Sequence, residues 1–426
     1  MPDGSSTAHL LQPKLIATLK AGYGVQAFRA DVMAAITVAI VALPLSMAIA
    51  VASGVSPARG LYTAIIGGFL VSALGGSRHQ IGGPAGAFIV LVAATTAKFG
   101  VDGLVVTVML SGTMLIALAL TRLGSLIRHI PHPVTVGFTC GIAVTIFGGE
   151  IRDLLGLTLP GAEPGRLIPK LQALAAAGST LTPSAAMLGL GTASMIFAVR
   201  RYRPSWPGML IAVAAASVLA AALHLPAVTI GARFGGIPGG LPTPHFPEMS
   251  LAEVWRLVPS AISFTLLGGI ESLLSAKVAD SMSGRKHRSN MELLAQGVAN
   301  IASGLFGGIS VTGTIARTAT NIRAGAQTPV AGMLHAVFVL LFMVAAAPLA
   351  QFIPLAALAG VLLVVCWNMA EKAEFARLLG HWPSALVLLT TFGLTLIEDL
   401  TFGIVAGCLV AAALSLGRRW SPRTKA

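Results

Sequence analysis

Charged residues are scarce in this chain of 426 residues, since Asp, Glu, Lys and Arg together make up only 10% of it. Soluble domains carry about 25% of these residues. Hydrophobic residues make up 55% of the chain, and its mean hydropathy is +0.84. So few charges cannot cover so much apolar surface in water, which excludes a soluble enzyme and a disordered chain. The composition predicts an all-α polytopic membrane protein, with the lipid bilayer as its surroundings.

Cysteine is also scarce, and the three cysteines, Cys140, Cys366 and Cys408, each lie in an apolar stretch. No CxxC or Cys/His spacing accompanies them, which excludes a disulfide scaffold and provides no zinc ligands. The HExxH, GxSxG and GxxxxGK(S/T) motifs are missing as well. A membrane protease and an ATP-driven pump are therefore excluded, and we expect neither an enzyme nor a bound cofactor or metal.

Acidic residues are scarcer than basic ones, with 15 Asp and Glu against 28 Lys and Arg. In a soluble protein this excess would suggest nucleic acid, but in a membrane protein Lys and Arg collect in cytoplasmic loops. We therefore expect no nucleic-acid partner. The basic residues alternate between loops in a way that predicts both termini on the cytoplasmic side of a bacterial inner membrane. The basic loops are 77–80, 122–132, 200–206, 281–290, 371–383 and the tail after 417.

Long apolar runs supply the predicted membrane spans, at about 20 residues each. Twelve runs have full length, and two short ones, 84–98 and 313–324, raise the count to fourteen. Two stretches, 150–182 and 225–256, are too polar or too rich in Gly and Pro to be membrane spans. Both are expected outside the cell. An interfacial amphipathic helix is predicted at 165–177. The full-length runs are 32–52, 59–75, 102–121, 133–149, 183–199, 207–224, 257–280, 291–305, 329–347, 354–370, 384–397 and 400–417.

The spans divide into two similar halves. Each half has seven spans, an odd number, so the halves must have opposite orientations in the membrane, as in an inverted repeat. Each half also reaches a Gly-rich break followed by a short helix, at IGGPAGA (81–87) and at GGISVTGTIA (307–316). The predicted divisions are a cytoplasmic segment 1–26, a first repeat 27–224, an extracellular connector 225–256, a second repeat 257–417 and a cytoplasmic tail 418–426.

The two breaks predict a binding site. A half-helix that begins at mid-membrane points its free N–H groups and the positive end of its dipole at that place. Two half-helices that meet there can bind a small inorganic or organic anion without a fully buried charge. Pro84 suits the first turn of a helix, and Gly86 lets a ligand approach the backbone. Ser310, Thr312 and Thr314 offer hydroxyl groups at the second break.

Two charged residues within apolar runs are further candidates for coupling or gating. Glu271 can carry a proton, help to bind a cation or hold a half-helix, and the alternative is a structural carboxylate bonded to the backbone. Arg317, one turn into the second half-helix, can lend positive potential to an anion, pair with an acid or point to the cytoplasm. Met47 and Phe88 either line the pocket or simply pack in the interior. The only accompanying ligand expected is a co-transported H⁺ or Na⁺.

Several blocks of the chain together resemble the sulfate permease (SulP) family of anion transporters. These blocks are ADVMAAITVAIVALPLSMAIA (30–50), SGVSPARGLYTAIIGG (53–68), IGGPAGAF (81–88), GGIESLLSAKVADSMSG (268–284), NMELLAQGVAN (290–300) and GGISVTGTIARTATNIRAGAQTPVAG (307–332). The resemblance implies fourteen spans in two inverted repeats, divided into a core and a gate domain, and a homodimer. Family members usually carry a STAS domain after the last span, which we do not expect here.

The resemblance also implies where the substrate binds, namely between the starts of the third and tenth helices, with the first span close by. The substrate-binding residues implied in this way are Pro84, Ala85, Gly86, Ala87, Phe88, Thr312, Gly313, Thr314, Ile315, Ala316, Pro44 and Met47. The expected function is a secondary active transporter of small anions of the sulfate, bicarbonate or dicarboxylate type. H⁺-coupled symport by alternating access is favoured. The alternatives are a nucleobase permease of the same layout and an anion channel.

Overall fold

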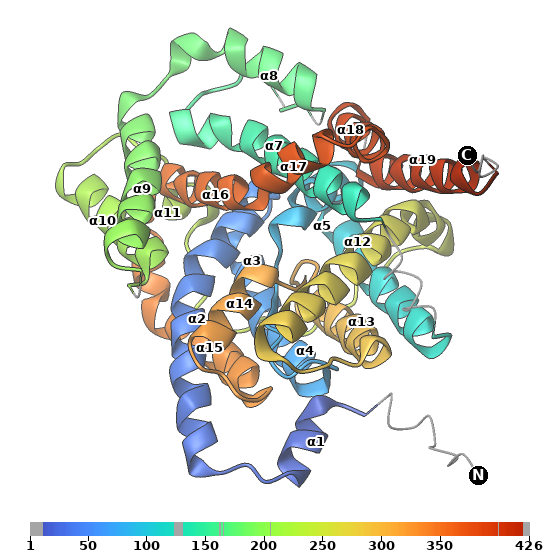
Figure 1. The fold of residues 1–426 in the computed structure, drawn as a ribbon. Helices are drawn as coiled ribbons and strands as arrows, with labels where there is room; N and C mark the ends of the chain where they lie inside the picture. Colours follow the sequence, from blue (N-terminus) through green and yellow to red (C-terminus); the bar gives the residue numbers. More distant parts are fainter. Residues whose placement is uncertain are drawn as a thin grey trace, which may run out of the picture.

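The computed structural model describes residues 12–122, 131–161, 163–164, 166–204, 206–398 and 400–420, and these residues are mostly helical (Figure 1). The predicted segments 1–26 and 418–426 and the loop 122–132 therefore lie partly outside the described residues. The helices are α1 (Lys14–Lys20), α2 (Val25–Ala52), α3 (Pro57–Tyr62), α4 (Gly68–Leu74), α5 (Ile89–Leu120), α7 (His132–Leu155), α8 (Leu167–Ala176), α9 (Pro183–Tyr202), α10 (Gly208–Ala222), α11 (Ile230–Phe234), α12 (Leu251–Ser283), α13 (Ser289–Leu305), α14 (Ile315–Arg323), α15 (Val330–Ala350), α16 (Leu355–Met369), α17 (Lys372–Leu379), α18 (Trp382–Ile397) and α19 (Leu400–Trp420).

Among the described residues, seven helical segments are long and apolar enough to cross a membrane. They are Val25–Ala52, Pro57–Leu74, Gly86–Leu120, His132–Leu155, Leu251–Ser283, Val330–Ala350 and Leu355–Leu379. Shorter apolar helices include Gly208–Ala222 and Trp382–Ile397. The prediction of a multi-pass helical membrane protein agrees with this pattern, while the count of fourteen spans stays a prediction.

Three elements can be compared in detail with the expectation. The runs 84–98 and 102–121 lie in α5 as two helical pieces separated by a kink at Gly100, whose φ of +70° glycine reaches without the steric cost of a Cβ atom. Helix α12 begins at Leu251, earlier than predicted, because the Ser250 side chain accepts from the N–H of Glu253 in a capping box. A helix, α8, is present within the range 165–177, and its position at the membrane interface stays a prediction.

The helices form two packing groups. We call the first the core group: α2–α5 pack with α12–α15 through contacts such as α5 with α13 and α2 with α15. We call the second the gate group: α7, α9, α10 and α16–α19 pack together through contacts such as α7 with α16 and α18. Figure 1 shows α14 and α15 beside α2, and α13 beside α4. The two groups meet where α16 and α10 contact α2.

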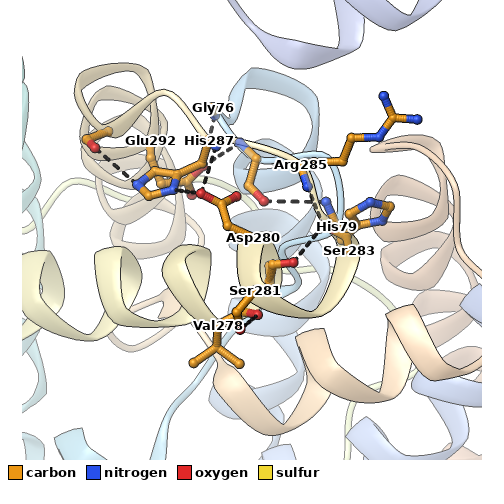
Figure 2. A network of polar contacts seen from close by, with 12 residues as sticks. Gly76, His79, Val278, Asp280, Ser281, Ser283, Arg285, His287 and Glu292 are labelled. Atoms are coloured by element: carbon orange, nitrogen blue, oxygen red, sulfur yellow. Dashed lines mark hydrogen bonds and ion pairs between the residues drawn. The ribbon is translucent and has the colours of Figure 1, made fainter.

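Polar contacts hold one end of the core group together, at the residues that follow α4 and α12 (Figure 2). The Glu292 carboxylate on α13 accepts the backbone N–H groups of Gly76 and Ser77 at 2.8 and 3.0 Å. These bonds tie α13 to the residues that leave α4. On α12, the Asp280 carboxylate bonds the ring of His287 at 2.7 Å. The extended chain that leads from α4 to the first break is thus held at its beginning.

Candidate functional site

The two Gly-rich breaks lie side by side as a two-stranded antiparallel ribbon. Strand β1 (Gly82–Gly83) pairs with β2 (Thr312–Gly313), so that Gly82 faces Gly313 and Gly83 faces Thr312. The approach is close at two glycines, because a Cβ at Gly83 would overlap the Arg317 guanidinium and one at Gly313 would overlap the Gln80 side chain, so that these side chains would have to move. The structure therefore brings together the two segments that the sequence singles out, although they are far apart in the chain.

Each strand leads into a helix start. After β1, residues Gly86–Phe88 form a short 3₁₀ turn that continues into α5. After β2, Thr314 caps α14, and its N–H and hydroxyl donate to the carbonyl of Ile81 at 3.0 and 3.2 Å. Within an α-helix, the backbone N–H groups of the first turn have no carbonyl oxygen to donate to. Ile315 and Ala316, at the start of α14, are exposed, so this helix end is accessible.

Arg317 places a positive charge against the first break. Its side chain is 1% exposed, and Nη2 donates to the carbonyl oxygen of Pro84. Its Nε and Nη1 groups have no hydrogen-bond partner among the described residues. The structure shows neither an acid paired with this guanidinium in the described part of the chain nor an exposed cytoplasmic position. Two nitrogen atoms of a buried cation, with three N–H bonds between them, therefore remain to be satisfied.

Ser272 on α12 is a site residue that the sequence analysis did not select. Its hydroxyl lies 2.7 Å from the Thr312 hydroxyl and accepts the backbone N–H of Gly313 at 3.2 Å. The amide of Gly313 is thus engaged by α12 in this conformation. The only sequence signal for Ser272 was its position directly after Glu271.

Glu271 is partly exposed, and its carboxylate has no hydrogen-bond or ion-pair partner among the residues that the structure describes. A structural carboxylate bonded to the backbone is therefore not what the geometry shows. Glu371, which follows α16 in the gate group, is near enough to interact with Glu271 electrostatically. The sequence analysis placed residue 371 in a cytoplasmic loop and gave it no role.

The gate group forms an apolar wall opposite Gly86. A Cβ at Gly86 would lie 3.3 Å from the sulfur of Met369 on α16, with Ile146 of α7 and Val365 within 3.9 Å. Phe88 is 1% exposed and stacks against Phe264 with ring centroids 5.5 Å apart. Its position is therefore an interior one.

The remaining candidates on the first span and the first break are apolar and buried. Pro44 and Met47 lie on α2, and Met47 belongs to the same hydrophobic cluster as Ala85, Ala87 and Phe88. These residues shape the interior beside the breaks. The polar groups at the breaks come instead from Ser272, Thr312, Thr314 and Arg317.

Taken together, the fold is that of a polytopic helical membrane protein with two interrupted helices whose breaks meet, which is the architecture of secondary transporters. The chain belongs to the Sulfate permease family, whose sequence model matches residues 28–390. It is therefore a membrane anion transporter and not an enzyme.

Two relatives that are described as transporters support this assignment. The chain is 42% identical over 406 residues to a putative sulfate transporter, YvdB, of Bacillus subtilis, covering 95% of this chain and 76% of YvdB. It is 32% identical over 405 residues to the bicarbonate transporter BicA of a Picosynechococcus species, covering 92% of this chain and 70% of BicA.

Solved structures support the fold. The transmembrane domain of a cyanobacterial bicarbonate transporter BicA matches with a TM-score of 0.80 and 29% identity, over 92% of this chain and 98% of that one. SLC26A9 matches with a TM-score of 0.87 over 97% of this chain and 69% of its own, at 16% identity, and so shows the fold alone. The predicted fold class is thereby confirmed.

Proposed function

We propose that this protein is a secondary active transporter of a small oxyanion of the sulfate, bicarbonate or dicarboxylate type, which binds between the starts of α5 and α14. The observation that carries the proposal is Arg317, a buried guanidinium with two unpartnered nitrogen atoms at the meeting point of two helix starts. An oxyanion satisfies such groups well, because its oxygens accept charge-assisted hydrogen bonds.

The anion would be bound by groups from both breaks. First-turn N–H groups of α14, at Ile315 and Ala316, and those at Gly86 and Ala87 would point at it from two sides. The Arg317 guanidinium would supply the balancing charge. Hydroxyls of Thr312 and Thr314 lie at the same place, with Ser272 behind them. Selectivity among oxyanions would then depend on the distance between the two helix starts.

Coupling to protons would pass through Glu271. An ionised carboxylate at this depth repels an approaching anion, whereas a protonated one does not. Protonation of Glu271 would therefore favour anion binding, and the two would cross the membrane together as a symport. Glu371 of the gate group adds to the repulsion when the groups approach. A sodium ion bound to the Glu271 carboxylate would also neutralise the charge that repels the anion, so Na⁺ is the alternative coupling ion.

Alternating access would follow from movement of the gate group against the core group around this site. The protein would lie in the inner membrane with both termini cytoplasmic and act as a homodimer, as the family resemblance implies.

The test is uptake of labelled sulfate, bicarbonate and succinate into proteoliposomes. Each anion is assayed with and without an inward proton gradient, and with and without sodium. Saturable uptake of one anion, driven by the proton gradient and with a higher KM in Arg317→Gln, is expected. Single-channel anion current without saturation would show a channel, and uptake of uracil alone would show a nucleobase permease; either result would refute the proposal.

A further inference from the structure

A second group of buried polar atoms without partners lies in the core group, beside the chain that leads into β1. It comprises His79, Gln80, Asn321 and His335, and we call it the polar cluster. These residues are between 0 and 7% exposed. Of the twelve buried side-chain polar atoms that lack a partner in the described part of the chain, six belong to these residues. Unpartnered atoms are thus concentrated at one place in the fold.

The four residues surround the extended chain that precedes β1. The Asn321 amide on α14 donates to the carbonyl of His79 at 2.9 Å. The Gln80 side chain covers Gly313, and the Gln80 carbonyl accepts from the Ser72 hydroxyl at 3.3 Å. On α15, Gly332 faces Ser72 and Ile81, and His335 lies one turn further on the same helix face. All of these elements belong to the core group.

Buried polar groups without partners are costly. Each one forfeits its hydrogen bonds to water and regains none, so six such atoms would consume most of the stability of a typical protein. Folded proteins solve this by holding water molecules, each with about three hydrogen bonds to such groups. Amide and imidazole groups both donate and accept, which suits water better than an ion.

The polar cluster reaches the cytoplasmic-loop side at His79. Figure 2 shows His79 beside Ser283 and Arg285, next to the bonded pair Asp280 and His287. His79 lies between the apolar segments Pro57–Leu74 and Gly86–Leu120. Burial, together with Arg78, lowers the pKa of His79 to about 4, so its ring is neutral at cytoplasmic pH.

The polar cluster also reaches α12. Thr318, one turn before Asn321 on α14, accepts the N–H of Ile81 at 3.0 Å and the Ser275 hydroxyl at 3.3 Å. Ser275 lies one turn after Glu271 on α12, and residues at this spacing share a helix face. The buried hydroxyl groups of Thr318 and Ser275 therefore lie between the polar cluster and Glu271, the carboxylate proposed to couple transport to protons.

We propose that the polar cluster binds a chain of ordered water molecules that carries protons between the cytoplasmic face at His79 and Glu271, separately from the anion route. This inference rests on the proton coupling of the proposed function. In each transfer, one imidazole nitrogen accepts a proton from a water while the other releases one to the next water, and the ring ends neutral with its tautomer exchanged. The anion route runs between the core and gate groups, whereas the waters lie wholly inside the core group.

The charged groups that act on the two rings are defined by the structure. Arg78, Arg285, Asp280 and Asp31 act on His79. The buried Arg317 acts on His335. At His79, burial together with Arg78 and Arg285 outweighs Asp31 and Asp280 and disfavours a stable imidazolium, so a proton is not trapped at this ring.

The first experiment compares His335→Leu with His335→Gln in proteoliposomes, with His245→Leu in the exposed connector as the matched control. Anion counterflow needs no net proton movement, whereas gradient-driven uptake does. His335→Leu is expected to keep counterflow, while its gradient-driven rate falls at least about tenfold. His335→Gln keeps a hydrogen-bond donor and an acceptor and is expected to retain most of the gradient-driven rate. Unchanged gradient-driven uptake in a folded His335→Leu protein would overturn the proton route.

The second experiment detects the water directly. Radiolytic hydroxyl-radical footprinting in isotope-labelled water is expected to label His335 despite its burial, and less so in Gln80→Leu. If His335 is not labelled and the His335→Leu protein has a higher melting temperature than the unaltered protein, the polar cluster contains no water. That result would overturn the proposed water chain. Absence of counterflow in the unaltered protein would instead refute the proposed function, and footprinting would still decide on the waters.

Discussion

At the scale of single residues, the site depends on two charges with different surroundings, the buried Arg317 and the partly exposed Glu271. Arg317 touches the first break from the second half-helix, and Glu271 stands on α12 beside the hydroxyl of Ser272. Neither forms an ion pair with the other or with another side chain in the described ranges. Each is therefore free to respond to a mobile ion.

Arg317→Gln is expected to weaken anion binding about ten- to hundredfold, because a charge-assisted hydrogen bond contributes roughly 1.5–3 kcal/mol. The measurement is the KM for uptake of the transported anion. Arg323→Gln, on the exposed end of the same helix, is the control and should leave KM unchanged. An unaltered KM in Arg317→Gln would remove the guanidinium from the site.

Glu271→Gln is expected to abolish proton-driven uptake while anion counterflow persists, because the amide imitates the protonated acid and cannot release a proton. The expected pH profile of counterflow is flat in the variant and falls with rising pH in the unaltered protein. Exposed Glu248→Gln serves as the control. Proton-driven uptake that survives in Glu271→Gln would end the coupling role.

At the scale of elements, the β1–β2 ribbon is what joins the two half-helices. It consists of two residues on each side, and its geometry requires small side chains. Gln80 fills the space over Gly313 that a side chain would otherwise occupy. The spacing of the two helix starts is thus set by the packing of glycine against a neighbouring side chain.

Gly313→Ala is expected to lower the melting temperature and weaken anion binding, because its Cβ would overlap the Gln80 side chain. Adding Gln80→Ala removes the overlapping atoms and should restore part of both losses, so the double variant should be non-additive. Gly240→Ala, at a glycine with open space around it, is the control. Purely additive effects would show that the ribbon tolerates a wider spacing.

At the scale of the whole molecule, the two helix groups meet over Gly86. Met369 of the gate group closes on this glycine, while Ile315 and Ala316 at the other helix start remain exposed. The structure therefore represents a state in which the two sides of the site are unequally covered. Transport by alternating access would require this contact to open.

A protein with cysteines at Gly86 and Met369, in a background without the native cysteines, is expected to cross-link under oxidation and to stop transporting. Reduction should restore uptake. The single variants Gly86→Cys and Met369→Cys are the controls, and the transport rate of each should be the same with and without oxidant. Full transport by a completely cross-linked protein would mean that the core and gate groups do not separate during turnover.

Composition and local pattern were enough to predict much of this protein. The scarcity of charge required a membrane fold, since apolar surface of this extent needs lipid. The breaks at 81–87 and 307–316 were visible because Gly and Pro interrupt apolar runs. Both effects are local, and each can be recognised from neighbouring residues alone.

Other features were decided only by the tertiary structure. The ribbon between the breaks, the contact of Arg317 with Pro84 and the hydroxyl of Ser272 at Thr312 all join residues from distant parts of the chain. The same holds for Met369 over Gly86 and for the polar cluster. Such contacts depend on how whole helices pack, because packing brings together side chains that are far apart in the sequence. The residues next to each side chain in the sequence do not indicate which partner it will contact.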